Sequence, residues 1–134
     1  MEDLSETPEL EAMRLVRRAR RRLVRKKKLL TATEFCLRGG ISKTELRRRL
    51  KHETVFGIDI GRERRYPAIF LRADRLGSRL ARVVRAMSGL DAWRKYFELT
   101  YRFESLGNRS LLQVMHRAVG FRAAMRYARA LAGD

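Results

Sequence analysis

The sequence predicts a mainly α-helical protein: a helix-turn-helix with a short β-hairpin wing, preceded by a basic N-terminal helix or arm and followed by a small C-terminal helical bundle. Two helix-start signals of the form Thr/Ser-x-x-Glu flank a Gly-Gly pair. Two short apolar runs separated by a turn signal follow them. The rest of the chain shows only helical spacing of its apolar residues. The predicted regions are 1–28 (arm), 29–72 (winged helix-turn-helix) and 73–134 (helical partner-binding region).

The first region predicts a helix over residues 8–27. Thr7 followed by Pro8 is typical of a helix start, and acidic residues in the first turn suit the helix dipole. The apolar stripe is narrow, so we expect this helix to be largely solvated or to order against a partner. Its basic face, from Arg14 to Lys28, suits a phosphate backbone, with water or anionic lipid as alternatives; lipid is least favoured because the stretch holds no aromatic anchor. Candidate backbone contacts are Arg17, Arg18, Arg21 and Arg25.

The second region carries the sharpest local signal. Thr31 with Glu34, and Ser42 with Glu45, predict two capping boxes at the starts of helices over 32–38 and 43–51. Gly-Gly between them supplies the backbone freedom for a sharp turn. This pattern is typical of a helix-turn-helix.

The second of these helices is basic and amphipathic. Leu46 and Leu50 recur four residues apart and are expected to face inward. In a helix-turn-helix the second helix enters the major groove of DNA. The predicted contacts are Ser42, Lys43, Thr44, Arg47, Arg48 and Lys51.

A wing is predicted after this helix. Residues 55–60 and 65–71 indicate two strands joined by a turn over 61–64. Pro67 has no N–H to donate, so we expect the second strand at a sheet edge. A hairpin tip beside the helix-turn-helix can contact DNA, although a solvated turn explains the same polarity. The predicted tip contacts are Arg62, Arg64 and Arg65.

The third region predicts helices at about 77–88, 91–104, 109–117 and 120–132. Two apolar stripes have helical spacing, and such stripes are usually core. We therefore expect packing roles, rather than base stacking, for the aromatic residues. The stripes are Trp93, Phe97 and Tyr101 on one helix, and Leu111, Leu112, Met115 and Val119 on the next.

The charge balance points to a polyanionic partner. Lys and Arg number 32 against 15 Asp and Glu, a formal net charge of +17 in 134 residues. Such a charge repels itself in a compact chain, and nucleic acid offsets it. We expect a DNA-binding regulator, with DNA favoured over RNA by the helix-turn-helix. The alternatives are an RNA-binding or ribosome-associated protein, and a basic surface that only aids solubility.

Residues that carry catalytic chemistry are few. Cys36 lies in an apolar helix run and suggests a small buried side chain; His52 and His116 show no metal-ligand spacing, and no Gly-rich phosphate loop occurs. The sequence thus predicts no enzyme, no cofactor and no metal site. No apolar stretch approaches the roughly 18 residues of a membrane span, and the acidic start is unlike a signal peptide, so we expect a cytoplasmic protein with no membrane partner.

Several short motifs extend from the second predicted strand to the last predicted helix: Tyr66-Pro67-Ala68-Ile69-Phe70, Trp93, Phe97, Leu106-Gly107-Asn108-Arg109-Ser110-Leu111, Met115, Gly120, Ala124 and Ala128. With these residues, the layout over residues 29–132 resembles the Xre/MbcA/ParS group of toxin-binding antitoxins. The resemblance implies an antitoxin of a type II pair, which binds its operator through the N-terminal part and a toxin through the C-terminal part. Toxin contacts at Trp93, Asn108, Arg109 and Ser110 follow from it, whereas a regulator without a toxin partner is the alternative. Ser110 departs from the family's usual Pro. A homodimer is expected of a helix-turn-helix.

Overall fold

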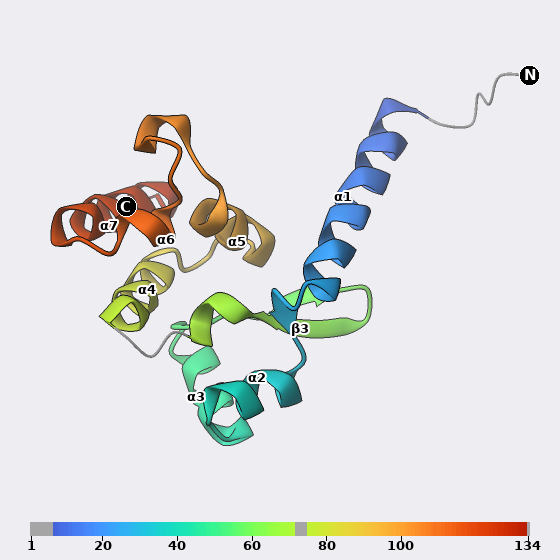
Figure 1. The fold of residues 1–134 in the computed structure, drawn as a ribbon, viewed down its shortest axis with the longest axis horizontal. Helices are drawn as coiled ribbons and strands as arrows, with labels where there is room; N and C mark the ends of the chain where they lie inside the picture. Colours follow the sequence, from blue (N-terminus) through green and yellow to red (C-terminus); the bar gives the residue numbers. More distant parts are fainter. Residues whose placement is uncertain (1–6, 72–74, 134) are drawn as a thin grey trace, which may run out of the picture.

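The computed structural model describes residues 7–71 and 75–133. These residues form a mainly α structure with seven α-helices, two short 3₁₀ helices and a small three-stranded antiparallel sheet (Figure 1). The elements are α1 (Pro8–Arg25), β1 (Leu29–Leu30), α2 (Ala32–Gly39), α3 (Lys43–Lys51), β2 (Ile58–Ile60), β3 (Glu63–Pro67), η1 (Ala68–Leu71), α4 (Arg75–Ala86), α5 (Ala92–Thr100), η2 (Glu104–Leu106), α6 (Leu111–Val114) and α7 (Ala118–Leu131).

Helix α1 begins as the sequence predicts. The Thr7 hydroxyl accepts a hydrogen bond from the backbone N–H of Leu10 at 3.2 Å, and Pro8 occupies the first turn. No residue of α1 is buried, and only Leu23 and Val24 near its end pack against the core. Figure 1 shows the helix standing out from the body with its N-terminal end farthest away. The expectation of a largely solvated helix is confirmed.

The turn between α2 and α3 also follows the sequence. Thr31 and Glu34 make both hydrogen bonds of a capping box at the start of α2. Gly40 ends α2 in the left-handed region (φ +64°), where a side chain would be strained. The second capping box is only half formed. The Ser42 hydroxyl accepts the backbone N–H of Glu45, but the Glu45 carboxylate binds Arg48 and Arg49 instead of the backbone N–H of Ser42.

The sheet differs from the prediction in strand order. The prediction of Pro67 on an edge strand is wrong, because β3 is central, in the order β1-β3-β2. Pro67 is tolerated there because it ends the strand. The next residue, Ala68, donates its backbone N–H to the carbonyl of Lys28, just before β1, at 2.8 Å. Because backbone groups of successive residues alternate in direction, the Pro67 nitrogen faces the β2 side. The pairing of β2 with β3 has already ended there, at Ile58 with Arg65, so no hydrogen bond is lost. The missed strand, β1, has only two residues.

The hairpin is shorter than its apolar runs suggest. Residues 55–57 are not paired, and 68–71 form the 3₁₀ helix η1 in place of strand. Val55, Phe56 and Phe70 are nevertheless buried, and the Phe56 and Phe70 rings meet edge to face with centroids 5.0 Å apart. These apolar residues serve the core without belonging to the ladder.

The C-terminal helices occur where predicted, with shorter bounds for α5 and α6. Leu111, Leu112 and Met115 are buried as expected, but Val119 is 69% exposed. At the start of α7, a Cβ on Gly120 would collide with the carbonyl of Val114, so glycine lets α6 and α7 meet closely.

The stripe predicted on α5 is also partly wrong. Tyr96 and Leu99 form its buried face, whereas Phe97 and Tyr101 are 48% and 50% exposed. Phe97 and Tyr101 are four residues apart and share the side of α5 that faces away from Tyr96 and Leu99, and the helix ends at Thr100.

One hydrophobic core joins the two predicted regions. Leu29 and Ile58 from the sheet belong to the same buried cluster as Leu80, Met87 and Leu99 from the C-terminal helices. Cys36 belongs to it as well, 8% exposed, as the sequence predicts. None of the helices within residues 7–71 and 75–133 is long and apolar enough to cross a membrane.

Candidate nucleic-acid interface

Helix α3 is held by one face and presents the other. Leu46 is 3% exposed and Leu50 packs against the core, which fixes the rotation of the helix about its axis. The Ser42 hydroxyl accepts the N–H of Glu45 at 3.0 Å and fixes the helix start. The opposite face therefore has a defined direction, which a side chain needs in order to contact a base edge.

The exposed face of α3 is a cationic stripe. Lys43, Arg47 and Lys51 recur every four residues and are all exposed. Thr44 lies beside them, and its hydroxyl accepts a hydrogen bond from Nη2 of Arg47 at 3.2 Å. We call Lys43, Arg47 and Lys51 the α3 stripe. The hydrogen bond to Thr44 partly orients the Arg47 guanidinium before any ligand binds.

Arg48 is placed differently from the stripe. Its Nε and Nη2 donate to the two carboxylate oxygens of Glu45 at 2.8 and 2.7 Å, and Arg49 donates to the same carboxylate at 3.0 Å. These hydrogen bonds from Arg48 and Arg49 lower the pKa of Glu45 to about 2. Arg48 thus already has an anionic partner within α3, and its charge offers less to an incoming phosphate than that of Arg47.

The three arginines predicted at the wing tip have three different environments. Gly61 and Arg62 form the two-residue turn between β2 and β3, with Gly61 at φ +61°. Arg62 is exposed at the tip. Arg64 is the second residue of β3 and pairs with Asp59 of β2. Its Nε donates to Oδ1 of Asp59 at 3.0 Å, and this hydrogen bond lowers the pKa of Asp59.

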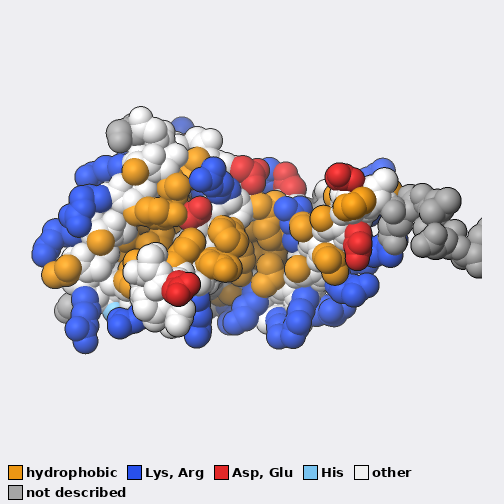
Figure 2. Space-filling view, turned by 90° about the horizontal axis from the view of Figure 1, so that it is seen from above, with side chains coloured by type: hydrophobic (Ala, Val, Ile, Leu, Met, Phe, Trp, Pro, Cys, Tyr) orange, Lys and Arg blue, Asp and Glu red, His pale blue; other side chains and the backbone are white. Residues whose placement is uncertain are grey.

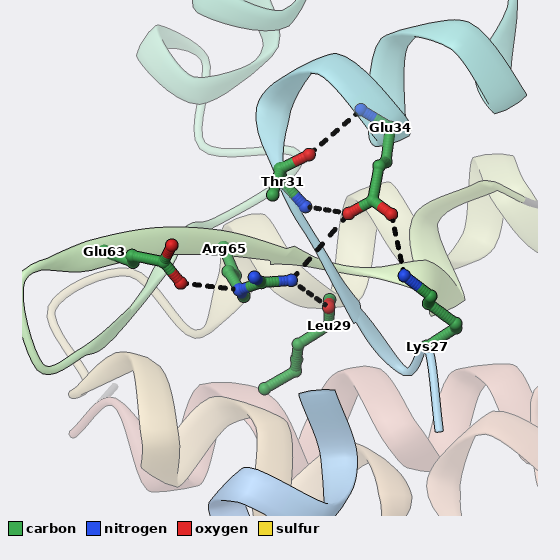
Figure 3. Close-up of polar contacts among 6 residues, drawn as sticks. All are labelled: Lys27, Leu29, Thr31, Glu34, Glu63 and Arg65. Atoms are coloured by element: carbon green, nitrogen blue, oxygen red, sulfur yellow. Dashed lines mark hydrogen bonds and ion pairs between the residues drawn. The ribbon is translucent and has the colours of Figure 1, made fainter. Parts of the chain in front are cut away.

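Arg65 does not lie at the tip. Its side chain is 14% exposed and points toward β1 and α2 (Figure 3). It donates to the Leu29 carbonyl at 3.3 Å and to Glu63 at 3.0 Å, and it lies 3.8 Å from the Glu34 carboxylate. Alternation along β3 turns Arg65 to the face opposite Arg64. Arg65 joins the wing to the start of α2, so we no longer count it among surface contacts.

Glu34 connects this network to the end of α1. Its carboxylate accepts from the Thr31 N–H at 3.0 Å and from Lys27 at 3.0 Å (Figure 3). The Thr31 backbone bond and the Lys27 bond lower the pKa of Glu34 to about 2. The capping box that the sequence predicts is therefore also the point where the arm, the wing and α2 meet.

The four arm residues predicted to contact the phosphate backbone of a nucleic acid are all exposed on α1: Arg17, Arg18, Arg21 and Arg25. Arg20, which lies on another side of the helix, has its guanidinium carbon 4.1 Å from the Trp93 ring centroid. This stacking anchors the arm to α5. The residue pattern carries no signal for this contact, because the two residues lie far apart in the chain.

The residues that the resemblance implies for toxin binding differ in burial. Trp93 is half-buried and its indole Nε1 donates to the Asp59 carbonyl at 3.4 Å, joining α5 to the hairpin. Ser110 is 6% exposed and forms a capping box with Gln113. Asn108, with φ +60°, and Arg109 are exposed in the preceding turn. Trp93 and Ser110 have clear structural roles.

An exposed aromatic cluster lies nearby and was missed. Phe97, Tyr101, Phe103 and Tyr127 are linked by ring contacts with centroids 4.7–6.5 Å apart. We call these four residues the aromatic patch. In Figure 2 hydrophobic side chains gather over the C-terminal part of the molecule. The helical spacing of Phe97 and Tyr101 indicates that they lie on one side of a helix, but we interpreted that side as buried.

Beneath the aromatic patch lies a buried carboxylate. Glu98 is 6% exposed; the Tyr127 hydroxyl donates to it at 2.7 Å, and Arg94 lies 3.7 Å from its other oxygen. Burial first, and then the hydrogen bond to Glu98, raise the pKa of Tyr127 to about 12. A cleft of about 270 Å³ opens beside Tyr127, lined mainly by apolar side chains that include Phe103, Leu106 and Val114.

Comparisons of the chain with protein-family models, with curated proteins and with solved structures find no match. Among the described residues, no group of three or more His, Cys, Asp or Glu side chains is placed to hold a metal ion. The side chains themselves are therefore the basis for a functional proposal.

Proposed function

We propose that this chain is a winged helix-turn-helix DNA-binding regulator that inserts α3 into the major groove. The observation that carries the proposal is the α3 stripe, in which Lys43, Arg47 and Lys51 line the exposed face of a helix whose other face is anchored by Leu46. The major groove of B-DNA admits one α-helix, and arginine reads guanine with two parallel hydrogen bonds. A net charge of +17 adds affinity that does not depend on sequence.

Supporting contacts come from two other elements. Arg62 at the hairpin turn and the exposed arginines of α1 suit phosphate oxygens, which position a protein on DNA without specifying sequence. Arg47 is the residue we expect to specify a base, because its neighbour Thr44 already orients it.

The test is a titration of the full chain against a DNA site selected from a random duplex library. Arg47→Ala should weaken binding to that site by about 1–3 kcal/mol and relax selectivity at one base pair. Arg126→Ala removes the same charge from an exposed position on α7 and serves as the matched control. Equal losses for the two variants would remove α3 as the reading element.

An RNA-binding or ribosome-associated role is the competing outcome of the same experiment. Duplex DNA and structured RNA are compared at matched salt, because both bind a basic protein more weakly as salt rises. A preference for structured RNA that persists across the salt series would overturn the choice of DNA.

A second candidate function, binding of a partner protein, is favoured by the aromatic patch. Phe97, Tyr101 and Tyr127 are 48%, 50% and 38% exposed, and the apolar cleft adjoins them. Exposed clustered aromatics are typical of interaction sites. With the resemblance to Xre/MbcA/ParS antitoxins, we propose a toxin as this partner, which would make the chain an antitoxin.

Co-expression with the product of the neighbouring gene tests this second function. If that product is toxic, the intact chain should rescue growth and co-purify with it, while Phe97→Ala with Tyr101→Ala should lose both. Val119→Ala, at an exposed apolar position outside the aromatic patch, is the control. A chain that neither rescues nor binds would stand as a regulator without a toxin partner.

A further inference from the structure

Helix α1 exposes an apolar face that no residue described by the structure covers. Met13, Leu15 and Val16 are 53%, 56% and 46% exposed, and no residue of the helix is buried. In Figure 2 hydrophobic side chains follow α1 on the right of the molecule, with basic side chains along its edge. Exposed apolar side chains gathered on one helix face indicate an interaction site.

Nucleic acid does not account for this face. Successive residues turn by about 100° around an α-helix, which puts Arg14, Arg17 and Arg21 on the side opposite Leu15 and Val16. A phosphate backbone bound by the arginines would leave the apolar side chains in water. The apolar face therefore needs an occupant of its own.

The helix also has a physical need for such an occupant. Arginines four residues apart, such as Arg14 with Arg18 and Arg17 with Arg21, repel each other along its basic side. An isolated helix of this length is marginal in water even without repulsion, and apolar packing is what ordinarily stabilises it. Among the residues 7–71 and 75–133, only Leu23 and Val24 of α1 supply such packing.

The charge distribution along α1 identifies the occupant. Glu9 and Glu11 lie in the first turn, while Arg22 and Arg25 lie in the last. Two copies placed antiparallel bring the acidic turn of each helix against the basic turn of the other. Two parallel copies instead bring arginine against arginine.

The positions of charged residues around the helix axis also favour antiparallel pairing. Glu11 and Arg22 are eleven residues apart, which places them about 20° from each other around the axis, on the same edge of the apolar face. A two-fold axis between antiparallel helices brings each edge against the same edge of the copy. Glu11 of one chain therefore faces Arg22 of the other. We propose that the chain forms a homodimer through antiparallel pairing of the apolar faces of α1.

Helix α1 is attached to the body near its C-terminal end. Its C-terminal end is held to the body by Leu23, Val24 and the stacking of Arg20 on Trp93. Its N-terminal turns extend away from the body (Figure 1). A helix of 18 residues is roughly 27 Å long, so antiparallel pairing puts the two bodies at opposite ends of the helix pair. The basic side of each α1 remains accessible.

The proposal is independent of nucleic-acid binding and is tested without any ligand. Sedimentation equilibrium of the full chain at about 0.15 M salt, where charges are screened beyond about 8 Å, should show a monomer–dimer equilibrium. Leu15→Gln with Val16→Gln should weaken the dimer by about tenfold or more. Arg17→Gln with Arg21→Gln, on the opposite side of the helix, should leave it as tight or tighter.

Neither pair of substitutions touches the core, so unchanged thermal unfolding of the body confirms that each variant folds. A wild-type chain that stays monomeric, or a Leu15→Gln/Val16→Gln variant that dimerises like the wild type, would overturn the proposal.

A charge exchange tests the orientation. Glu11→Arg and Arg22→Glu should each weaken the dimer, because each puts like charges together across the helix pair. The double variant restores the opposite charges and should recover most of the affinity in an antiparallel pair. A double variant as weak as the two single losses combined would refute antiparallel pairing.

Discussion

Helices α1 and α3 are both rich in arginine and lysine, yet they relate to the rest of the molecule in opposite ways. Helix α3 buries Leu46 and has a fixed rotation, whereas α1 buries no residue over 18 positions. A contact that reads a base needs a side chain held in a fixed direction, while a phosphate contact needs mainly charge. The comparison shows that burial, and not charge, separates a candidate reading helix from a general polyanion-binding one.

The largest difference should appear in core substitutions. Leu46→Ala removes a side chain that is 3% exposed, so it should lower the free energy of unfolding by about 2–5 kcal/mol. At protein concentrations where the chain is monomeric, Leu15→Ala on α1, which is 56% exposed, should change that free energy by less than about 0.5 kcal/mol. Urea unfolding followed by circular dichroism measures both. Similar losses would mean that α1 belongs to the cooperative unit.

Neutralising the arm should change how binding depends on salt. Replacing Arg17, Arg21 and Arg25 by Ala should weaken binding to every duplex and reduce the slope of log K against log salt by up to about 2.7, at about 0.9 per phosphate contact. Selectivity between sites should stay the same. A loss of selectivity would instead assign base reading to α1. Replacing Arg122, Arg126 and Arg129 on α7 is the matched control.

Helix caps should separate the two helices on a smaller scale. Ser42→Ala removes the cap of α3 and should lower the free energy of unfolding by about 1 kcal/mol, because the anchored helix carries the loss into the core. Thr7→Ala removes the equivalent cap of α1 and should only fray its first turn. Thermal unfolding reports the first effect and helix content at low temperature the second. Equal shifts in thermal midpoint would contradict this difference.

The smallest effect is a dependence of stability on acid pH. Binding to Arg48 and Arg49 lowers the folded-state pKa of Glu45 from 4.5 to about 2, so its contribution to stability is complete above pH 4.5 and disappears as pH falls toward 2. Glu34, lowered to about 2 by Thr31 and Lys27, behaves in the same way. Glu45→Gln should flatten the decline of the thermal midpoint between pH 4.5 and 2. A decline as steep as that of the wild type would show that Glu45 does not contribute.

The interactions predicted well are local in the sequence. The caps at Thr7, Thr31 and Ser42, the turn at Gly40 and the inward face of α3 each depend on residues within about four positions of one another. Hydrogen bonds and packing at that range are decided by backbone geometry, which the residue pattern reveals directly.

The interactions predicted poorly join distant parts of the chain. Arg65 was expected at the wing tip, but it contacts Leu29, which lies 36 residues earlier. Pro67 was expected at an edge because it has no N–H to donate, and the partner strand β1, with two residues and no periodic signal, was missed. Phe97 was expected in the core, but Tyr96 and Leu99 occupy the face that meets it.

By itself, the sequence determined the charge of the molecule, the positions of its helices and the cationic stripe of α3. Tertiary structure decided which arginines remain on the surface: it held Arg48 on Glu45, turned Arg65 inward and stacked Arg20 on Trp93. It also left the apolar face of α1 without a cover among the residues that the structure describes. The physical reason is that charge and helix formation depend on each residue and its near neighbours, whereas burial depends on which distant surfaces come together.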